Sequence, residues 1–258
     1  MKEKTIIFVR ELVETVAYSK RHMMIWVMLM IWSILPLPAE EKTNPWRAGM
    51  TLTDSMVSQI GVDRCFSSET ISDVVFTRMQ GKTWKKECPL KRSDYRYLKI
   101  LHRNADGVTQ MGEMICNKSI ADKLVRIFRL LYEANYRIER MVLLDDYDAD
   151  DERSMTDNNT SCFNYRVVKG SAKLSAHAKG LAIDINPLYN PYVKQGKQGI
   201  VIQPVAGRKY AYRRDKRKDI PYKIDHNDLA YKLFKEYGFS WGGDWRSLKD
   251  YQHFEYKK

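Results

Sequence analysis

After residue 45, helical and strand-like patterns follow one another in an irregular order, and this order sets the class of fold. Apolar residues recur at helical spacing in three segments, predicted at residues 68–80, 119–131 and 225–237. Strand-like pieces lie between them, predicted at residues 95–101, 138–144, 181–185 and 251–256. A doubly wound sheet requires a regular strand–helix alternation, so the sequence predicts an α+β fold instead.

An apolar run near the start of the chain predicts export. Residues 23–35 (MMIWVMLMIWSIL) are broken only by Ser33, follow Lys20 and Arg21, and are followed by the small residue Ala39. A basic segment, an apolar stretch and a small residue are typical of a secretory signal, here cleaved after Ala39. The run is short for a full membrane span, which needs about 20 apolar residues. An uncleaved anchor and a buried helix of a cytosolic protein remain the alternatives.

The net charge and the cysteines restrict the partners and the compartment. The 258 residues include 44 Lys and Arg against 32 Asp and Glu, for a formal charge of +12. Such a charge suits an anionic partner, but export argues against nucleic acid and favours anionic polymers of the envelope. The four cysteines are too far apart for a CxxC zinc module: Cys65, Cys88, Cys116 and Cys162. Outside the cytosol they permit two disulfides, and buried free thiols are the alternative.

Two charged runs are interpreted as solvated loops. Residues 208–218 (RKYAYRRDKRK) are strongly basic, and residues 145–152 (DDYDADDE) are acidic. The acidic run lacks the spacing and the glycine of an EF-hand loop, which argues against calcium.

Histidine is scarce, so elimination is informative. Of the five histidines, His22 lies in the leader, and His102 and His226 suit structural or surface roles. The other two, His177 and His253, have unusual surroundings.

His177 precedes a short strand that carries an acidic residue. In residues 181–185 the apolar side chains alternate, so Leu181, Ile183 and Ile185 face one side and Asp184 faces the other. A carboxylate in so apolar a strand is costly to bury unless it is paired or binds a metal ion.

The second histidine follows another acidic residue. His253 lies three residues after Asp250, among aromatic residues that favour a strand. Two imidazoles and the Asp184 carboxylate make a three-ligand site with an open fourth position, as catalytic zinc requires. Zinc lowers the pKa of bound water to about 7, and a base must then accept its proton. Asp250 is the candidate for that base. On one regular strand it would face away from His253, so it is expected in the turn before that strand.

The sequence around these residues resembles the zinc D-Ala-D-Ala carboxypeptidases and the L-alanyl-D-glutamate endopeptidases of phage lysins. The motif S-x-H-x-x-G-x-A-x-D is met by Ser175, His177, Gly180, Ala182 and Asp184. An acidic residue shortly before the closing histidine is met by Asp250 and His253. The stretches 158–166, 182–191 and 241–245 resemble the same branch, and the likeness runs from about Gly112 to the end of the chain.

The resemblance implies roles for the site residues. His177, Asp184 and His253 would be ligands of one Zn²⁺ ion, and Asp250 would be the general base. Arg166 matches the family arginine that steadies the oxyanion, where a guanidinium contributes several kcal/mol in a dry site. For contacts with the substrate we expect Ser175, Trp241 and Tyr251, although Trp241 and Tyr251 suit a core equally well.

The resemblance also implies a fold and a domain order. The fold would be of the Hedgehog and D,D-peptidase type, with a small antiparallel sheet that carries the zinc site and is flanked by helices. Residues 1–39 would be the signal peptide or anchor, residues 40–110 a helical lead-in, and residues 111–258 the catalytic domain.

Together these features predict an exported zinc metallopeptidase of the periplasm or cell envelope that cuts a peptidoglycan stem peptide as a D-Ala-D-Ala carboxypeptidase. An L-Ala-D-Glu-type endopeptidase and a non-catalytic, zinc-dependent wall-binding module are the alternatives. No S-x-x-K or G-x-S-x-G motif occurs, so the sequence offers no serine nucleophile for the same reaction.

Overall fold

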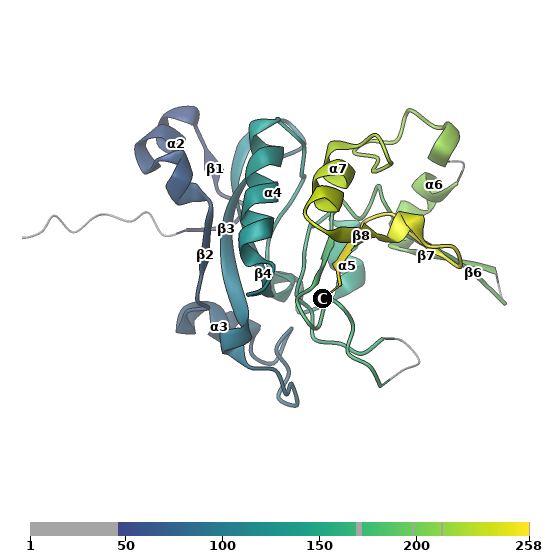
Figure 1. The fold of residues 1–258 in the computed structure, drawn as a ribbon, viewed down its shortest axis with the longest axis horizontal. Coiled ribbons are helices and arrows are strands. Elements are labelled where there is room, and N and C mark those ends of the chain that lie inside the picture. The colour runs from purple at the N-terminus through teal and green to yellow at the C-terminus, as the bar shows by residue number, and fades with distance from the viewer. Residues whose placement is uncertain (1–45, 169–171, 198, 213, 258) are drawn as a thin grey trace, which may run out of the picture. The chain divides into compact units, whose positions relative to one another are not determined.

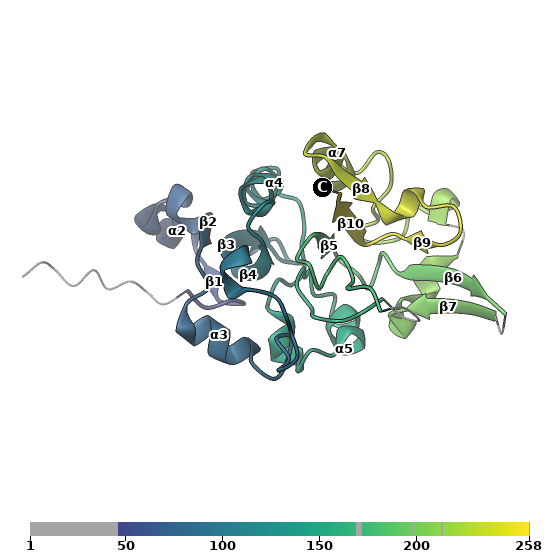
Figure 2. The same ribbon diagram turned by 60° about the horizontal axis from the view of Figure 1, so that its bottom comes forward.

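The computed structural model describes residues 46–168, 172–197, 199–212 and 214–257, which lie in one compact unit, Trp46–Lys258. The predicted α+β class is confirmed, because short helices and small antiparallel sheets alternate irregularly (Figures 1 and 2). The described helices are α2 (Asp54–Ile60), α3 (Asp73–Met79), α4 (Ala121–Glu133), α5 (Asp151–Thr156), α6 (Arg208–Ala211) and α7 (Leu229–Glu236). No helix in this part of the chain has the length and apolar character that crossing a membrane requires. The predicted leader, residues 1–39, lies outside the described residues.

The first sheet has the strand order β1-β4-β3-β2. Its centre is a long hairpin of β3 (Tyr95–Arg103) and β4 (Thr109–Asn117), and its edges are β1 (Thr51–Leu52) and β2 (Ser67–Glu69). The helix α4 packs on this sheet with the apolar face that its spacing predicts (Figure 1): Leu124, Ile127, Phe128 and Leu131 are buried. The sheet runs across the domain boundary expected between residues 110 and 111, and residues 46–110 contribute three of its strands besides α2 and α3.

The rest of the chain builds two three-stranded antiparallel sheets (Figure 2). One has the order β5-β10-β8, with β5 (Ala182–Asp184), β10 (His253–Tyr256) and β8 (Phe239–Trp241). The other has the order β7-β6-β9, with β7 (Gly199–Gln203), β6 (Tyr192–Gly196) and β9 (Lys249–Asp250). The two sheets are linked through the short connection between β9 and β10, with Asp250 just before it and His253 just after it.

The helices exist where the sequence predicts them, but their first residues differ. The α3 helix begins at Asp73 because the Ser72 side chain accepts a hydrogen bond from the Val75 amide, while Ser68 lies in β2. The α7 helix begins at Leu229 because the side chain of Asp228, its N-cap, accepts hydrogen bonds from the amides of Ala230 and Tyr231.

The α4 helix begins without a side-chain cap. Its N-cap is Ile120, which makes no side-chain capping bond, and the Ser119 hydroxyl instead lies 2.7 Å from the Asn117 side-chain oxygen.

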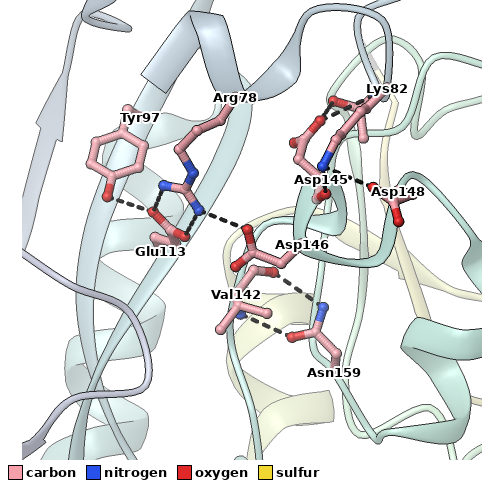
Figure 3. A network of polar contacts seen from close by, with 10 residues as sticks. Arg78, Lys82, Tyr97, Glu113, Val142, Asp145, Asp146, Asp148 and Asn159 are labelled. Carbon is pink, nitrogen blue, oxygen red and sulfur yellow. Dashed lines mark hydrogen bonds and ion pairs between the residues drawn. The ribbon is translucent and has the colours of Figure 1, made fainter. Parts of the chain in front are cut away.

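Three of the four predicted strands are confirmed: β3 is longer than the predicted segment 95–101, while β5 and β10 are shorter than the predicted segments 181–185 and 251–256. The fourth predicted segment, residues 138–144, forms no strand. The apolar residues of that stretch are buried, but the side chain of Asn159 bonds both the amide and the carbonyl of Val142 (Figure 3). A side-chain amide here replaces the neighbouring strand that would otherwise pair the backbone.

The acidic and basic runs are not wholly solvated loops. Asp145 is buried and accepts hydrogen bonds from the amide and hydroxyl of Thr83. Arg214 is buried too, and its guanidinium donates to Asn190 and lies 4.3 Å from the centre of the Tyr251 ring. Each run therefore contributes one charged residue to the packing.

A polar network ties α3 to the first sheet (Figure 3). Arg78 of α3 forms two hydrogen bonds to the Glu113 carboxylate of β4, at 2.6 and 2.9 Å, and a third to Asp146. Glu113 is only 2% exposed and also accepts from the Tyr97 hydroxyl, so its charge is fully compensated.

All four cysteines lie within the described residues, and each is a free thiol. Cys65, Cys116 and Cys162 are buried, which agrees with the alternative of small hydrophobic side chains rather than disulfides.

Candidate metal centre

Three side chains that the sequence predicts as zinc ligands converge in the structure. The His177 Nε2 atom lies 3.3 Å from Asp184 Oδ2 and 3.2 Å from His253 Nδ1, and His253 Nδ1 lies 3.0 Å from Asp184 Oδ1. The side chains of both histidines are 8% exposed and that of Asp184 is 14% exposed, so the group is mostly buried but reachable from solvent.

Antiparallel pairing brings two of these residues together. His253 is the first residue of β10 and stands opposite Asp184, the last residue of β5. Directly opposed residues of an antiparallel pair project to the same face of the sheet, so both side chains meet on one face.

A tight turn delivers His177 to this face. The Ser175 hydroxyl accepts a hydrogen bond from the Ala178 amide, and the Gly180 amide donates to the His177 carbonyl. Gly180 has a positive φ of +63°, and a Cβ atom there would lie 2.6 Å from the Asn117 backbone nitrogen. The turn therefore depends on glycine at position 180 to dock against the end of β4.

Polar contacts at the far side of each ring determine which nitrogen faces inward. His177 Nδ1 lies 2.7 Å from the Cys162 carbonyl oxygen, which can only accept, so Nδ1 carries a proton and Nε2 is free to bind a metal. His253 Nε2 lies 3.7 Å from Glu255 Oε2, and its Nδ1 faces Asp184 and His177.

The three donor atoms fit zinc. Two nitrogens and one carboxylate oxygen are ordinary zinc ligands, with bond lengths of about 2.0–2.2 Å. Tetrahedral ligands at these lengths lie about 3.3 Å from one another. The two imidazole nitrogens are 3.2 Å apart, and the Asp184 carboxylate lies between the rings, with Oδ1 3.0 Å from His253 and Oδ2 3.3 Å from His177. Three protein ligands leave the fourth position open.

The electrostatics of the group favour a cation at its centre. Burial alone would raise the pKa of Asp184, but His177 and His253 outweigh it and hold that pKa well below its usual range. Burial would lower the pKa of His253, but its contacts with Asp184 and Glu255 outweigh it and raise the pKa to about 10. A proton on the His253 ring thus balances the charge of the Asp184 carboxylate. A divalent cation bound by the three side chains would replace that proton.

Asp250, the predicted base, lies beside this group on a separate strand. It belongs to β9 and pairs with Tyr192 of β6, so it is outside β10 as expected but in a two-residue strand rather than a turn. Its Oδ1 atom is buried and has no hydrogen-bond partner among the described residues. Burial raises the pKa of Asp250 to about 6, against an opposing effect of His253. A carboxyl group with such a pKa can accept and release protons near neutral pH.

Arg166 forms an ion pair with Asp151 rather than with a residue of this group. Its Nε atom lies 2.9 Å from Asp151 Oδ2, and its side chain is 43% exposed. The Arg166 carbonyl accepts a hydrogen bond from the amide of Ser175, which precedes His177 by two positions. The backbone of Arg166 therefore pairs with the segment that leads into the His177 turn.

The three predicted substrate contacts are built into the structure of the site. Ser175 is buried and stabilises the His177 turn. Trp241 is buried in the core, and its indole nitrogen donates to the Tyr251 carbonyl at 2.8 Å. The ring of Tyr251 is half-buried under Arg214. These contacts give all three residues a structural role.

Two residues that the sequence analysis did not assign also shape the site. Glu255 follows His253 by two positions on β10, and this strand spacing is the signal that could have placed it on the same face. Gly242 packs so closely on β9 that a Cβ atom there would lie 2.7 Å from the Asp250 Cβ atom.

A comparison with protein families matches residues 169–256 to a family described as D-alanyl-D-alanine carboxypeptidase. No curated protein and no solved structure matches the chain. The matched segment contains His177, Asp184, Asp250 and His253, and it begins after Arg166. Over this segment the chain resembles the zinc D,D-carboxypeptidases, and the match supports a peptidase that acts on peptidoglycan-related substrates.

Proposed function

We propose that the protein is an exported zinc metallopeptidase that hydrolyses a peptide bond in the stem peptide of peptidoglycan, as a D-Ala-D-Ala carboxypeptidase does. The observation that carries this proposal is the convergence of His177, Asp184 and His253: the two imidazole nitrogens lie 3.2 Å apart, and each lies 3.0–3.3 Å from one oxygen of the Asp184 carboxylate. Since the three residues are scattered over 77 positions of the sequence, a structural role alone gives no reason for so regular a set of donors.

The protein's own groups perform distinct tasks in this reaction. His177, Asp184 and His253 would hold the zinc ion, which when bound supplies a Lewis acid that lowers the pKa of water to about 7. Asp250 accepts the proton of the attacking water and passes it to the leaving amine. Its buried Oδ1 atom has no hydrogen-bond partner among the described residues, which supports this role, because a carboxylate oxygen committed to other hydrogen bonds would be a weaker base.

Arg166 would steady the negative charge that develops on the carbonyl oxygen. Its ion pair with Asp151 is exposed, and exposed pairs contribute only about 0–1 kcal/mol, so a substrate can displace Asp151 at little cost. The pair with Asp151 therefore orients the Arg166 guanidinium and still leaves it able to bind the substrate.

Two alternatives remain on the same site. An endopeptidase that cuts between L-Ala and D-Glu would use the same four residues, and a wall-binding module would use only the three ligands. The poised carboxylate of Asp250 favours an enzyme, because a binding module needs no base. Export and a location in the periplasm or envelope belong to the proposal and depend on the apolar run at residues 23–35.

Defined muropeptides test the proposal. The full chain is incubated with a pentapeptide stem, with and without a chelator, and the products are identified by mass spectrometry. Loss of the terminal D-Ala supports the carboxypeptidase, and an internal cut supports the endopeptidase. An unchanged substrate in the presence of added zinc would leave only the binding module. A signal peptide is tested separately, by determining the N-terminal residue of the secreted protein.

A further inference from the structure

A cleft of about 910 Å³ lies next to the candidate metal centre. Its walls come from the start of β3, the end of β4, the chain on both sides of His177, and β10. Glu255 lines the cleft and approaches His253 to 3.7 Å, and Ala176, also on the wall, immediately precedes His177. The cleft thus adjoins the residues that would hold the zinc ion, and we refer to it as the lysine cleft.

Four lysines line this cleft, against two acidic residues: Lys118, Lys173, Lys179 and Lys257, against Asp94 and Glu255. Asp94 lies 2.7 Å from Lys118 Nζ, and Glu255 Oε2 lies 3.7 Å from His253 Nε2, so each acidic residue has a partner within the protein. Lys179 and Lys257 are exposed. The surplus charge of the lysine cleft is therefore positive and open to solvent.

Apolar and aromatic side chains make up the rest of the wall. Tyr95 is buried, while Leu181 and Tyr256 are half-buried and form part of the surface that faces the cleft. A surface with a few cations around apolar groups suits a ligand that carries carboxylates on a short aliphatic frame. An acidic peptide has this chemistry.

We infer that the lysine cleft binds the carboxylate-bearing part of an acidic peptide, the part that extends away from the bond to be cut. The identity of the peptide as a stem peptide rests on the proposed function, whereas the preference for carboxylates rests on the cleft alone. Exposed charge pairs are individually weak, so two lysines together account for about a tenfold gain in affinity. Salt screens such pairs, so the gain decreases with ionic strength.

A matched pair of ligands and a matched pair of variants test this inference. The ligands are a synthetic stem peptide with a free glutamate α-carboxylate and the same peptide with a carboxamide in its place. Binding is measured by calorimetry with the full chain carrying Asp250→Ala, so that turnover does not consume the ligand. In that background we expect about tenfold tighter binding of the carboxylate peptide. The double variant Lys179→Glu with Lys257→Glu should lose this preference.

The control is a double variant with the same change of charge at exposed lysines outside the cleft, Lys197→Glu with Lys232→Glu, which should keep the preference. Equal affinity for the two peptides, no binding of either, or an equal loss in the control would overturn the inference. Turnover of both peptides by the chain with Asp250 intact is measured separately. A carboxylate preference without turnover would contradict the peptidase and support the lysine cleft as a binding site. Turnover without the preference would support the peptidase and contradict the role of the lysine cleft.

Discussion

The Asp184 carboxylate is shared between two imidazole rings: its Oδ1 atom lies 3.0 Å from His253 and its Oδ2 atom 3.3 Å from His177. The pairing of β5 with β10 fixes the first contact, and the glycine-dependent turn before β5 fixes the second. The donors are therefore preorganised by backbone structure, and a metal ion need not order them on binding.

Replacing one donor should remove the metal and the activity together. We expect His253→Ala to lose zinc, as measured by elemental analysis of the folded protein, because two ligands hold zinc far less tightly than three. His226→Ala is the control, since that ring is exposed and bonded to Asp244. Full zinc occupancy in His253→Ala would contradict the ligand assignment.

Replacing the base should separate metal binding from catalysis. Asp250→Ala is expected to retain zinc and to lower kcat by about 10²–10⁴-fold, the usual contribution of a general base. The measurement combines zinc content with the rate of D-Ala release. An active Asp250→Ala enzyme would refute the role of Asp250, and loss of zinc would make it a ligand instead.

The buried His102 should make stability depend on pH. Burial lowers the pKa of His102 from 6.5 to about 4, while its Nδ1 atom lies 2.7 Å from the Ile138 carbonyl. The unfolded chain therefore binds more protons between pH 6.5 and pH 4, and stability falls as the pH decreases through this window, by about 3 kcal/mol at its lower end. Urea unfolding at pH 7 and pH 4.5 measures the loss. In His102→Gln the loss between these two pH values should be smaller by about 2 kcal/mol, and an identical loss in both proteins would exclude His102 as its source.

The thiols should differ in reactivity. Burial raises the pKa of Cys65, Cys116 and Cys162, and these side chains are enclosed. Cys88 is only partly buried, although burial raises the pKa of its thiol as well. We expect a thiol reagent to label Cys88 alone in the native protein and all four cysteines after unfolding without reductant. Fewer than four in the unfolded protein would reveal a disulfide.

The ion pair between Arg78 and Glu113 should contribute measurably to stability. Arg78→Ala leaves the Glu113 carboxylate buried with only the Tyr97 hydroxyl, which we expect to cost about 2 kcal/mol. The comparison is Arg129→Ala, whose partners Asp63 and Glu133 are exposed and whose loss should cost less than about 1 kcal/mol. Equal unfolding midpoints for the two variants would argue against this assignment.

The sequence predicts the residues of the site better than it predicts the strands around them. Elimination among five histidines, together with the alternation around Asp184, leads to the three residues that the structure brings together. The hairpin of β6 and β7 and the strand β9 were not predicted, because short strands with mixed polar residues have little periodicity. The missing strand at residues 138–144 has another cause: the backbone of Val142 pairs with a side chain, Asn159, whose position no local pattern reveals.

The strand β10 lies between β5 and β8 in its sheet, although both neighbours precede it in the sequence. During folding, β5 and β8 therefore have no ladder to join until β10 inserts between them. That insertion also carries His253 to Asp184, so closing the sheet and completing the metal site are one event. Bound metal should accordingly stabilise this sheet. Removing the metal should increase amide hydrogen exchange in β5, β8 and β10 more than in any other strand.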